Sequence, residues 1–82
     1  MVIVCYSPSF QKALQKIKDN TFRERVYKQI AKIVSNPEVG KPMRYMRKGY
    51  REVYVTPYRI SYAYIVQEKK IVFLALYHKD EQ

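Results

Sequence analysis

The sequence predicts a single α+β domain over residues 1–82, in which an N-terminal strand and a helical hairpin pack on a mainly antiparallel four-stranded sheet. Three observations lead to this fold. The chain of 82 residues has the length of one small domain. Its first half carries two apolar stripes at helical spacing, and its second half carries three alternating segments separated by short turns. The expected order of elements is β-α-α-β-β-β.

The chain is predicted to start with a short strand and a helix. Residues 2–6 alternate β-branched and aromatic side chains, which is typical of a strand. Ser7 supplies an N-cap oxygen and Pro8 fits the first helical turn, so a helix is expected to begin there. Its apolar stripe consists of Phe10, Ala13, Leu14 and Ile17.

A second helix is predicted after a break at Asp19 and Asn20. Thr21 and Glu24 have the spacing of a capping box, which marks a helix start. The helix is expected to end before Pro37. Its apolar stripe consists of Phe22, Val26, Ile30, Ile33 and Val34. Because the break between the two helices is short, they are expected to form a helical hairpin.

The second half is predicted to form an antiparallel meander. Residues 37–50 lack a regular period and contain both glycines of the chain, so a loop is expected there. Three strands follow, joined by turns at 56–57 and 67–69, and they are expected over 51–55, 58–66 and 70–77.

Alternation along the middle strand assigns its two faces. The bulkier set of side chains is expected to face the helices and consists of Ile60, Tyr62, Tyr64 and Val66. Arg59 then lies on the opposite, open face. The sequence leaves open whether Arg51 on the preceding strand shares that face, because this depends on the pairing register.

The chain is strongly basic, and its charge is unevenly distributed. Sixteen Lys and Arg residues against seven Asp and Glu residues give a net charge of +9. Residues 37–51 hold five basic side chains and one acidic one, which predicts an RNA-binding patch formed by Lys41, Arg44, Arg47 and Lys48. The basic residues of the helices are interpreted instead as a solvated polar face: Lys12, Lys16, Lys18, Arg23, Arg25, Lys28 and Lys32. The expected partner is a polyanion or an acidic protein.

The residue content also limits the chemistry. Cys5 is the one cysteine and His78 the one histidine, so neither a disulfide framework nor a metal site is expected. The sequence has no Gly-rich phosphate loop and no long apolar stretch, so no cofactor and no membrane partner are expected. The chain is expected to be cytoplasmic, and the sequence leaves its oligomeric state open.

Arg59 is the leading candidate for a phosphate contact, because a guanidinium can donate two parallel hydrogen bonds to an anion. The alternative is a cross-strand ion pair with Glu52. At the end of the last strand, Tyr77, His78 and Lys79 could stack on a base, transfer a proton or neutralise a phosphate. The alternative for these three residues is a purely structural or solubilising role.

An RNA-recognition motif is not expected. Residues 48–55 match part of its consensus, but two of the aromatic positions that stack on bases are occupied by other residues. The predicted order of elements also differs from that fold.

Three strand segments resemble the RelE/ParE toxin superfamily. They are Arg51-Glu52-Val53-Tyr54-Val55, Tyr58-Arg59-Ile60-Ser61-Tyr62 and Leu76-Tyr77-His78-Lys79. The helical hairpin followed by Asn-Pro-x-x-Gly-Lys-Pro at 36–42 is similar as well, so the resemblance covers nearly the whole chain. It implies the toxin of a type II toxin–antitoxin pair, held inactive by an acidic, RelB-like antitoxin protein.

The RelE branch of this superfamily cuts mRNA on the ribosome, and the arginine of its Tyr-Arg-Ile strand contacts the scissile phosphate. The resemblance gives that role to Arg59, a looser one to Arg51, and a proton-transfer or charge role to Tyr77, His78 or Lys79. Without a metal, the 2′-hydroxyl of the RNA would attack the phosphate while cations stabilise the transition state. Two alternatives stay open: a ParE-like inhibitor of DNA gyrase without nuclease activity, and an inactive relative that binds RNA or antitoxin.

Overall fold

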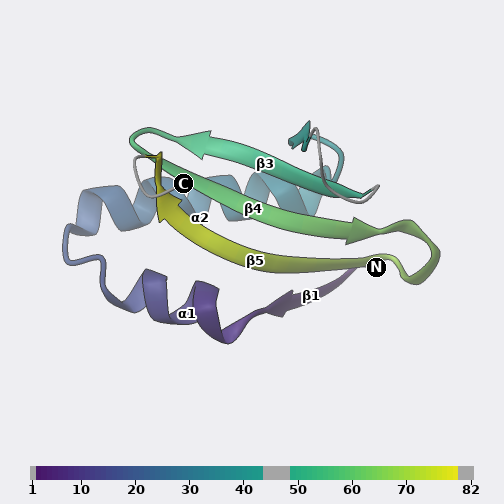
Figure 1. Cartoon of the computed structure of the whole chain (residues 1–82), viewed down its shortest axis with the longest axis horizontal. Helices are drawn as coiled ribbons and strands as arrows, with labels where there is room; N and C mark the ends of the chain where they lie inside the picture. Colours follow the sequence, from purple (N-terminus) through teal and green to yellow (C-terminus); the bar gives the residue numbers. More distant parts are fainter. Residues whose placement is uncertain (1, 44–48, 80–82) are drawn as a thin grey trace.

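The computed structural model describes residues 2–43 and 49–79, and it confirms the α+β class (Figure 1). The sheet has five strands in the order β1-β5-β4-β3-β2. In chain order the elements are β1 (Ile3–Tyr6), α1 (Pro8–Gln15), α2 (Asn20–Ser35), β2 (Lys41–Pro42), β3 (Tyr50–Val55), β4 (Tyr58–Ile65), a 3-10 turn (Val66–Glu68) and β5 (Lys70–His78).

The expectation of four strands was wrong by one element. Strand β2 lies in the segment that was expected to be a loop, and it pairs with β3 through Lys41 opposite Glu52 and Pro42 opposite Arg51. Two residues are too few to show a strand period, so sequence alone could not reveal this strand. Strand β1 pairs in parallel with β5, and the remaining pairs are antiparallel, as expected for a meander.

The predicted N-cap of α1 is confirmed, whereas the predicted N-cap of α2 is wrong. The Ser7 side chain accepts a hydrogen bond from the Phe10 N–H at 3.0 Å, which confirms it as the N-cap of α1. The predicted capping box of Thr21 and Glu24 is wrong. Asp19 caps α2 instead, accepting from the Thr21 N–H at 2.9 Å, because its carboxylate lies two residues earlier and satisfies free amides of the first turn.

Strand β5 contains a bulge that changes which side chains face the helices. Ser61 pairs with Ala75 and Tyr62 pairs with Phe73, so Leu74 has no partner on β4. The Leu74 carbonyl instead accepts a hydrogen bond from the Ser7 hydroxyl at 2.7 Å. The same hydroxyl therefore serves the start of α1 and the bulge of β5.

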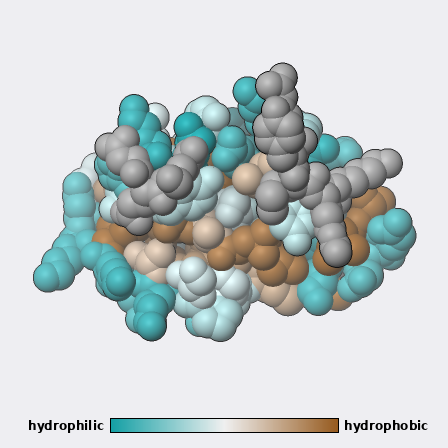
Figure 2. Space-filling view, viewed as in Figure 1, coloured by the Kyte–Doolittle hydropathy of each residue, from teal (hydrophilic) through white to brown (hydrophobic). Residues whose placement is uncertain are grey.

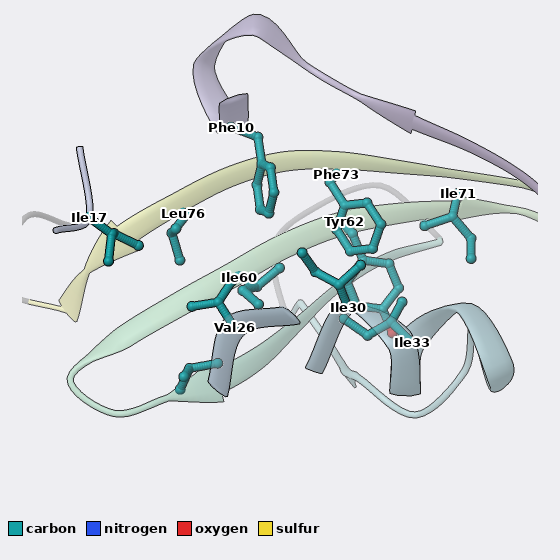
Figure 3. Packing of buried hydrophobic residues seen from close by; sticks show 11 residues of the cluster. Phe10, Ile17, Val26, Ile30, Ile33, Ile60, Tyr62, Ile71, Phe73 and Leu76 are labelled. Carbon is teal, nitrogen blue, oxygen red and sulfur yellow. The ribbon is translucent and has the colours of Figure 1, made fainter. Parts of the chain in front are cut away.

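The core lies between the helices and one face of the sheet (Figure 3). Phe10 of α1 and Val26, Ile30 and Ile33 of α2 point towards the strands, where fully or nearly fully buried side chains meet them. On the sheet side these are Ile60, Tyr62, Ile71, Phe73 and Leu76. Burial of these apolar surfaces is the main force that holds the helices to the sheet.

The predicted core face of the middle strand is largely confirmed. Ile60 and Tyr62 are fully buried, and Tyr64 packs against the core. Val66 was wrongly included: it belongs to the 3-10 turn after β4 and is 60% exposed. The strand period simply ends one residue earlier than expected.

The other face of the sheet carries no described helix and is called the open face below. In Figure 1 helix α2 lies behind the sheet, so Figure 2, drawn in the same view, looks onto the open face. An apolar band crosses this face and hydrophilic side chains border it (Figure 2). None of the described helices is both long enough and apolar enough to span a bilayer.

Candidate active site on the open face of the sheet

Three side chains form a row across the open face. Tyr54 on β3 pairs with Arg59 on β4, and Arg59 pairs with Tyr77 on β5. Directly paired residues on neighbouring strands project to the same face, so these three side chains are neighbours. Glu52 lies two residues before Tyr54 and shares the face. These four residues are called the arginine row below.

Arg59 is at the centre of the row. Its guanidinium carbon lies 4.7 Å from the centre of the Tyr54 ring, which is within the range of a cation–π interaction. Arg59 is partly buried, whereas Tyr54 is 52% exposed. A guanidinium carries five N–H donors in a planar fork, which is the geometry that suits a phosphate or carboxylate.

Glu52 and Tyr77 add a proton acceptor and a proton donor. The Tyr54 hydroxyl donates to a carboxylate oxygen of Glu52 at 3.3 Å. The Tyr77 hydroxyl is hydrogen-bonded to Arg59 and to Glu52. Burial raises the pKa of Tyr77 above its ordinary value, the negative charge of Glu52 raises it further, and Arg59 lowers it. Tyr77 therefore keeps its proton at neutral pH, next to a carboxylate that can accept one.

Arg51 does not join this row. It pairs with Tyr62, whose side chain is buried on the helix face, so Arg51 projects to the face opposite Arg59. One nitrogen of its guanidinium donates to the backbone carbonyls of Gly40 at 2.7 Å and Glu38 at 3.0 Å. The register thus settles the question that the sequence left open, and it gives Arg51 a contact with the chain before β2.

Tyr62 contacts the same segment from the core. Its hydroxyl donates to the Pro37 carbonyl at 2.8 Å and accepts from the Gly40 N–H at 2.9 Å. A Cβ atom at Gly40 would lie only 2.5 Å from that hydroxyl, so the close approach requires glycine. Arg51, Tyr62 and Gly40 are called the carbonyl clamp below, because they fix the segment that leads into β2.

The three candidates at the end of β5, Tyr77, His78 and Lys79, also do not lie together. His78 pairs with Tyr58, and their rings meet edge to face at 5.4 Å on the helix side of the sheet. Lys79 is exposed, and its backbone N–H donates to the Pro57 carbonyl at 3.0 Å. Of the three, Tyr77 is the one that lies beside Arg59.

The predicted RNA-binding patch is only partly visible. Lys41 is exposed and lies opposite Glu52, at the β3 end of the arginine row. Arg44, Arg47 and Lys48 lie outside the described residues. Among residues 2–43 and 49–79, no three histidine, cysteine or carboxylate side chains gather as they would to hold a metal ion.

Glu52 is the functional candidate that sequence reasoning missed. It was considered only as a possible ion-pair partner of Arg59, whereas its hydrogen bonds with Tyr54 and Tyr77 place it inside the row. The available signal was its spacing of two from Tyr54, which puts both side chains on one face of a strand. Recognising its link to Tyr77 required the pairing of three strands.

Comparisons with known proteins identify the family. The family model described as the ParE toxin of the type II toxin–antitoxin system parDE matches residues 4–82. A search of the curated proteins found no match.

Solved structures of RelE toxins share the fold. The intact RelBE toxin–antitoxin complex of E. coli matches with a TM-score of 0.80 and 18% identity, covering 93% of this chain and 94% of that one. The archaeal RelE–RelB complex of Pyrococcus horikoshii matches with a TM-score of 0.79 and 18% identity, covering 99% and 98%.

The RelBE2 toxin–antitoxin complex of Mycobacterium tuberculosis gives a TM-score of 0.75 and 22% identity, covering 95% of this chain and 98% of that one. These matches cover 93% to 99% of this chain, and the family model spans almost the whole sequence. The chain therefore belongs to the RelE/ParE superfamily and is the toxin of a type II toxin–antitoxin system.

Proposed function

We propose that this toxin is an endoribonuclease that cuts messenger RNA on the ribosome, in the cytoplasm. The observation that carries the proposal is the arginine row, which brings a guanidinium, a carboxylate and a protonated phenol together on an open face. These are the groups that cleavage of RNA by its own 2′-hydroxyl requires: a cation for the phosphate, a proton acceptor and a proton donor.

In the proposed step, residues of the arginine row accept and donate every proton that moves. Glu52 takes the proton of the 2′-hydroxyl while that oxygen forms a bond to phosphorus. The bond from phosphorus to the 5′-oxygen breaks, and the departing oxygen takes a proton from Tyr77. The products are a 2′,3′-cyclic phosphate and a 5′-hydroxyl. Because Tyr77 and Glu52 are hydrogen-bonded, the proton can return from the carboxylic acid to the phenolate and restore the site.

Arg59 stabilises the transition state. The phosphate gains negative charge as the 2′-oxygen attacks, and a guanidinium fixed beside it favours that charge more than the ground state. The exposed ring of Tyr54 next to Arg59 offers a base a surface on which to stack. Arg51 takes no part in this step, and we assign it a positioning role through the carbonyl clamp. His78 and Lys79 are likewise left out of the proton transfer.

Dependence on the ribosome follows from the shape of the site. The row lies on one face of a small sheet, so the described residues supply few groups that could orient a flexible RNA. A ribosome presents the message in a fixed conformation and supplies the alignment that the toxin lacks.

The partner that restrains this toxin is an antitoxin, as in those similar RelE structures that were solved as complexes with RelB. We infer an acidic, RelB-like protein, because a net charge of +9 on 82 residues favours a negatively charged partner. Folding of an acidic segment upon this surface would neutralise both charges.

The test is to map the ends of messenger RNA after incubation of the purified toxin with programmed ribosomes. We expect cyclic-phosphate ends with the parent protein and a loss of about 100- to 1000-fold in cleavage rate with Arg59→Ala. Lys28→Ala, which removes an exposed cation of α2 outside the row, is the matched control and should cleave at the parent rate. Equal rates for Arg59→Ala and the parent would refute the assignment.

Inhibition of DNA gyrase is the second candidate function. It is favoured by the family model, which describes a ParE toxin. It requires no proton donor or acceptor, so it leaves the link between Tyr77 and Glu52 without a role. A supercoiling assay separates the two functions. If the purified toxin inhibits gyrase and leaves ribosome-bound message intact, gyrase inhibition replaces RNA cleavage as the proposed function.

A further inference from the structure

A basic trough lies where the arginine row ends at β5. The pairs between β1 and β5 stop at Phe73, so no described strand covers the outer edge of β5 near Tyr77. Helix α1 lies beside this part of β5 (Figure 1). Between them is a depression of 300 Å³, whose lining includes Ser9, Lys12, Ala13, Lys16, Tyr58 and Tyr77.

The α1 side of this depression is one face of the helix. Ser9, Lys12, Ala13 and Lys16 are spaced three and four residues apart, so they line up along the trough. A second depression of 480 Å³ continues it, because the two share Lys16, Ile17 and Tyr58. The second depression adds Phe22 and the exposed cations Lys18 and Arg25. The two together are called the α1 trough.

The α1 trough is strongly positive. The described residues that line it include four cations, Lys12, Lys16, Lys18 and Arg25, and one carboxylate, Asp19. The Asp19 carboxylate is engaged as the helix cap of α2. A positive groove that also contains aromatic rings is the arrangement that proteins use for single-stranded nucleic acids, with cations against phosphates and rings against bases.

We propose that the α1 trough binds the single-stranded RNA on one side of the scissile phosphate, with Lys12 and Lys16 contacting its backbone. The proposal rests on the nuclease function given above and adds a binding subsite to it. Tyr77 makes the connection, since it belongs to the arginine row and also lines the trough. An RNA strand that crosses the row from β3 to β5 must pass this uncovered edge, and it meets the lysines of α1 there.

RNA fits the trough better than an acidic peptide does. The cations are spread along two joined depressions, as the regularly repeated charge of a phosphate backbone requires. The partly buried rings of Phe22 and Tyr58, 5.1 Å apart, add an aromatic surface beside these cations, and the Arg25 guanidinium lies 5.6 Å from the centre of the Phe22 ring. A substrate must reach from the trough to the arginine row, so it needs the two to be continuous. A protein partner that only covers the surface does not need this continuity.

The test compares two charge-matched double variants in binding to RNA that cannot be cleaved. Lys12→Ala/Lys16→Ala removes the proposed contacts. Lys28→Ala/Lys69→Asn removes two exposed cations that do not line the trough, and asparagine suits the left-handed backbone at position 69. Binding of a labelled 12-nucleotide 2′-O-methyl RNA is followed by fluorescence anisotropy over a range of salt concentrations, after thermal melting shows that both variants fold.

We expect Lys12→Ala/Lys16→Ala to weaken binding roughly tenfold more than the control and to lower the slope of log affinity against log salt by about 1.4, or 0.7 for each lost phosphate contact. A trinucleotide, which is too short to leave the row, should bind both variants equally. Equal weakening of the 12-nucleotide RNA by both variants, or no RNA binding by the parent protein, overturns the proposal.

An acidic peptide is the competing occupant. If a Glu-rich peptide loses affinity for Lys12→Ala/Lys16→Ala while RNA binding is unchanged, the trough is a protein-docking site and the proposal is wrong. The RNA used here cannot react, so failure of the subsite and failure of the nuclease assignment are separate results. The latter is decided by Arg59→Ala on ribosomes.

Discussion

Two arginines on adjacent strands of one sheet show how the same side chain takes different tasks. Arg51 points to the helix side and donates to two backbone carbonyls. Arg59 points to the open side and lies over a tyrosine ring, next to a second tyrosine and near a carboxylate. Backbone carbonyls are fixed acceptors that hold the Arg51 guanidinium in place, whereas Arg59 contacts side chains on a face that carries no described helix.

Under the proposed function, this difference divides this region of the sheet into a structural side, with Arg51, and a chemical side, with Arg59. The carbonyl clamp ties the segment before β2 to β3 and β4, so its loss should lower stability. The arginine row contributes few buried contacts, so its loss should lower activity.

Replacing Glu52 by glutamine should reduce cleavage of ribosome-bound message by about 100-fold or more, because the neutral amide cannot accept the proton of the 2′-hydroxyl. The same change removes a negative charge near Arg59, so binding of uncleavable RNA should become tighter. Rates from single-turnover cleavage and affinities from anisotropy measure the two effects. Unchanged cleavage together with tighter binding would make Glu52 only an ion-pair partner of Arg59.

Replacing Arg51 by alanine should lower the free energy of unfolding by roughly 2–3 kcal/mol, because two backbone carbonyls lose a charged donor. Urea denaturation followed by circular dichroism gives the value. Cleavage by the folded protein should stay within a few-fold of the parent. If Arg51→Ala were as stable as the parent but cleaved RNA much more slowly, Arg51 would act in the reaction and the structural role would be wrong.

Replacing Tyr62 by phenylalanine should lower the free energy of unfolding by about 1–2 kcal/mol. The ring still fills its place in the core, but the Pro37 carbonyl and the Gly40 N–H lose their partner. The same denaturation experiment measures the loss. A variant as stable as the parent would show that water replaces the hydroxyl without cost.

The smallest effect is a pH dependence. Burial raises the pKa of Tyr62 in the folded protein, while the hydrogen bond from Gly40 and the charge of Arg51 lower it. A raised folded pKa means that the folded state binds more protons than the unfolded state, so this contribution is complete below the ordinary tyrosine pKa and is lost as pH rises above it. Stability measured from pH 8 to about 11 should fall more steeply for the parent than for Tyr62→Phe.

The sequence predicts the fold more fully than the site. Helical stripes, turn residues and strand alternation give the class, the order of the main elements and the orientation of Arg59, because these depend on local periods. The face of Arg51 and the choice of Tyr77 over His78 depend on cross-strand register and on a bulge, which no local period reveals. Asp19 as the cap of α2 shows the same limit, since two polar candidates lie within one turn.

The bulge at Leu74 has a consequence for the chemistry of the open face. If β5 kept the pairing of Phe73 with Tyr62 without a break, Leu76 would stand opposite Arg59 and the phenol of residue 77 would turn towards the helices. One surplus residue, anchored by the hydroxyl of Ser7, therefore decides which functional group the guanidinium meets. Moving the bulge to another position along β5 would therefore change the side chain opposite Arg59, and the amino acids next to Arg59 in the sequence could stay the same.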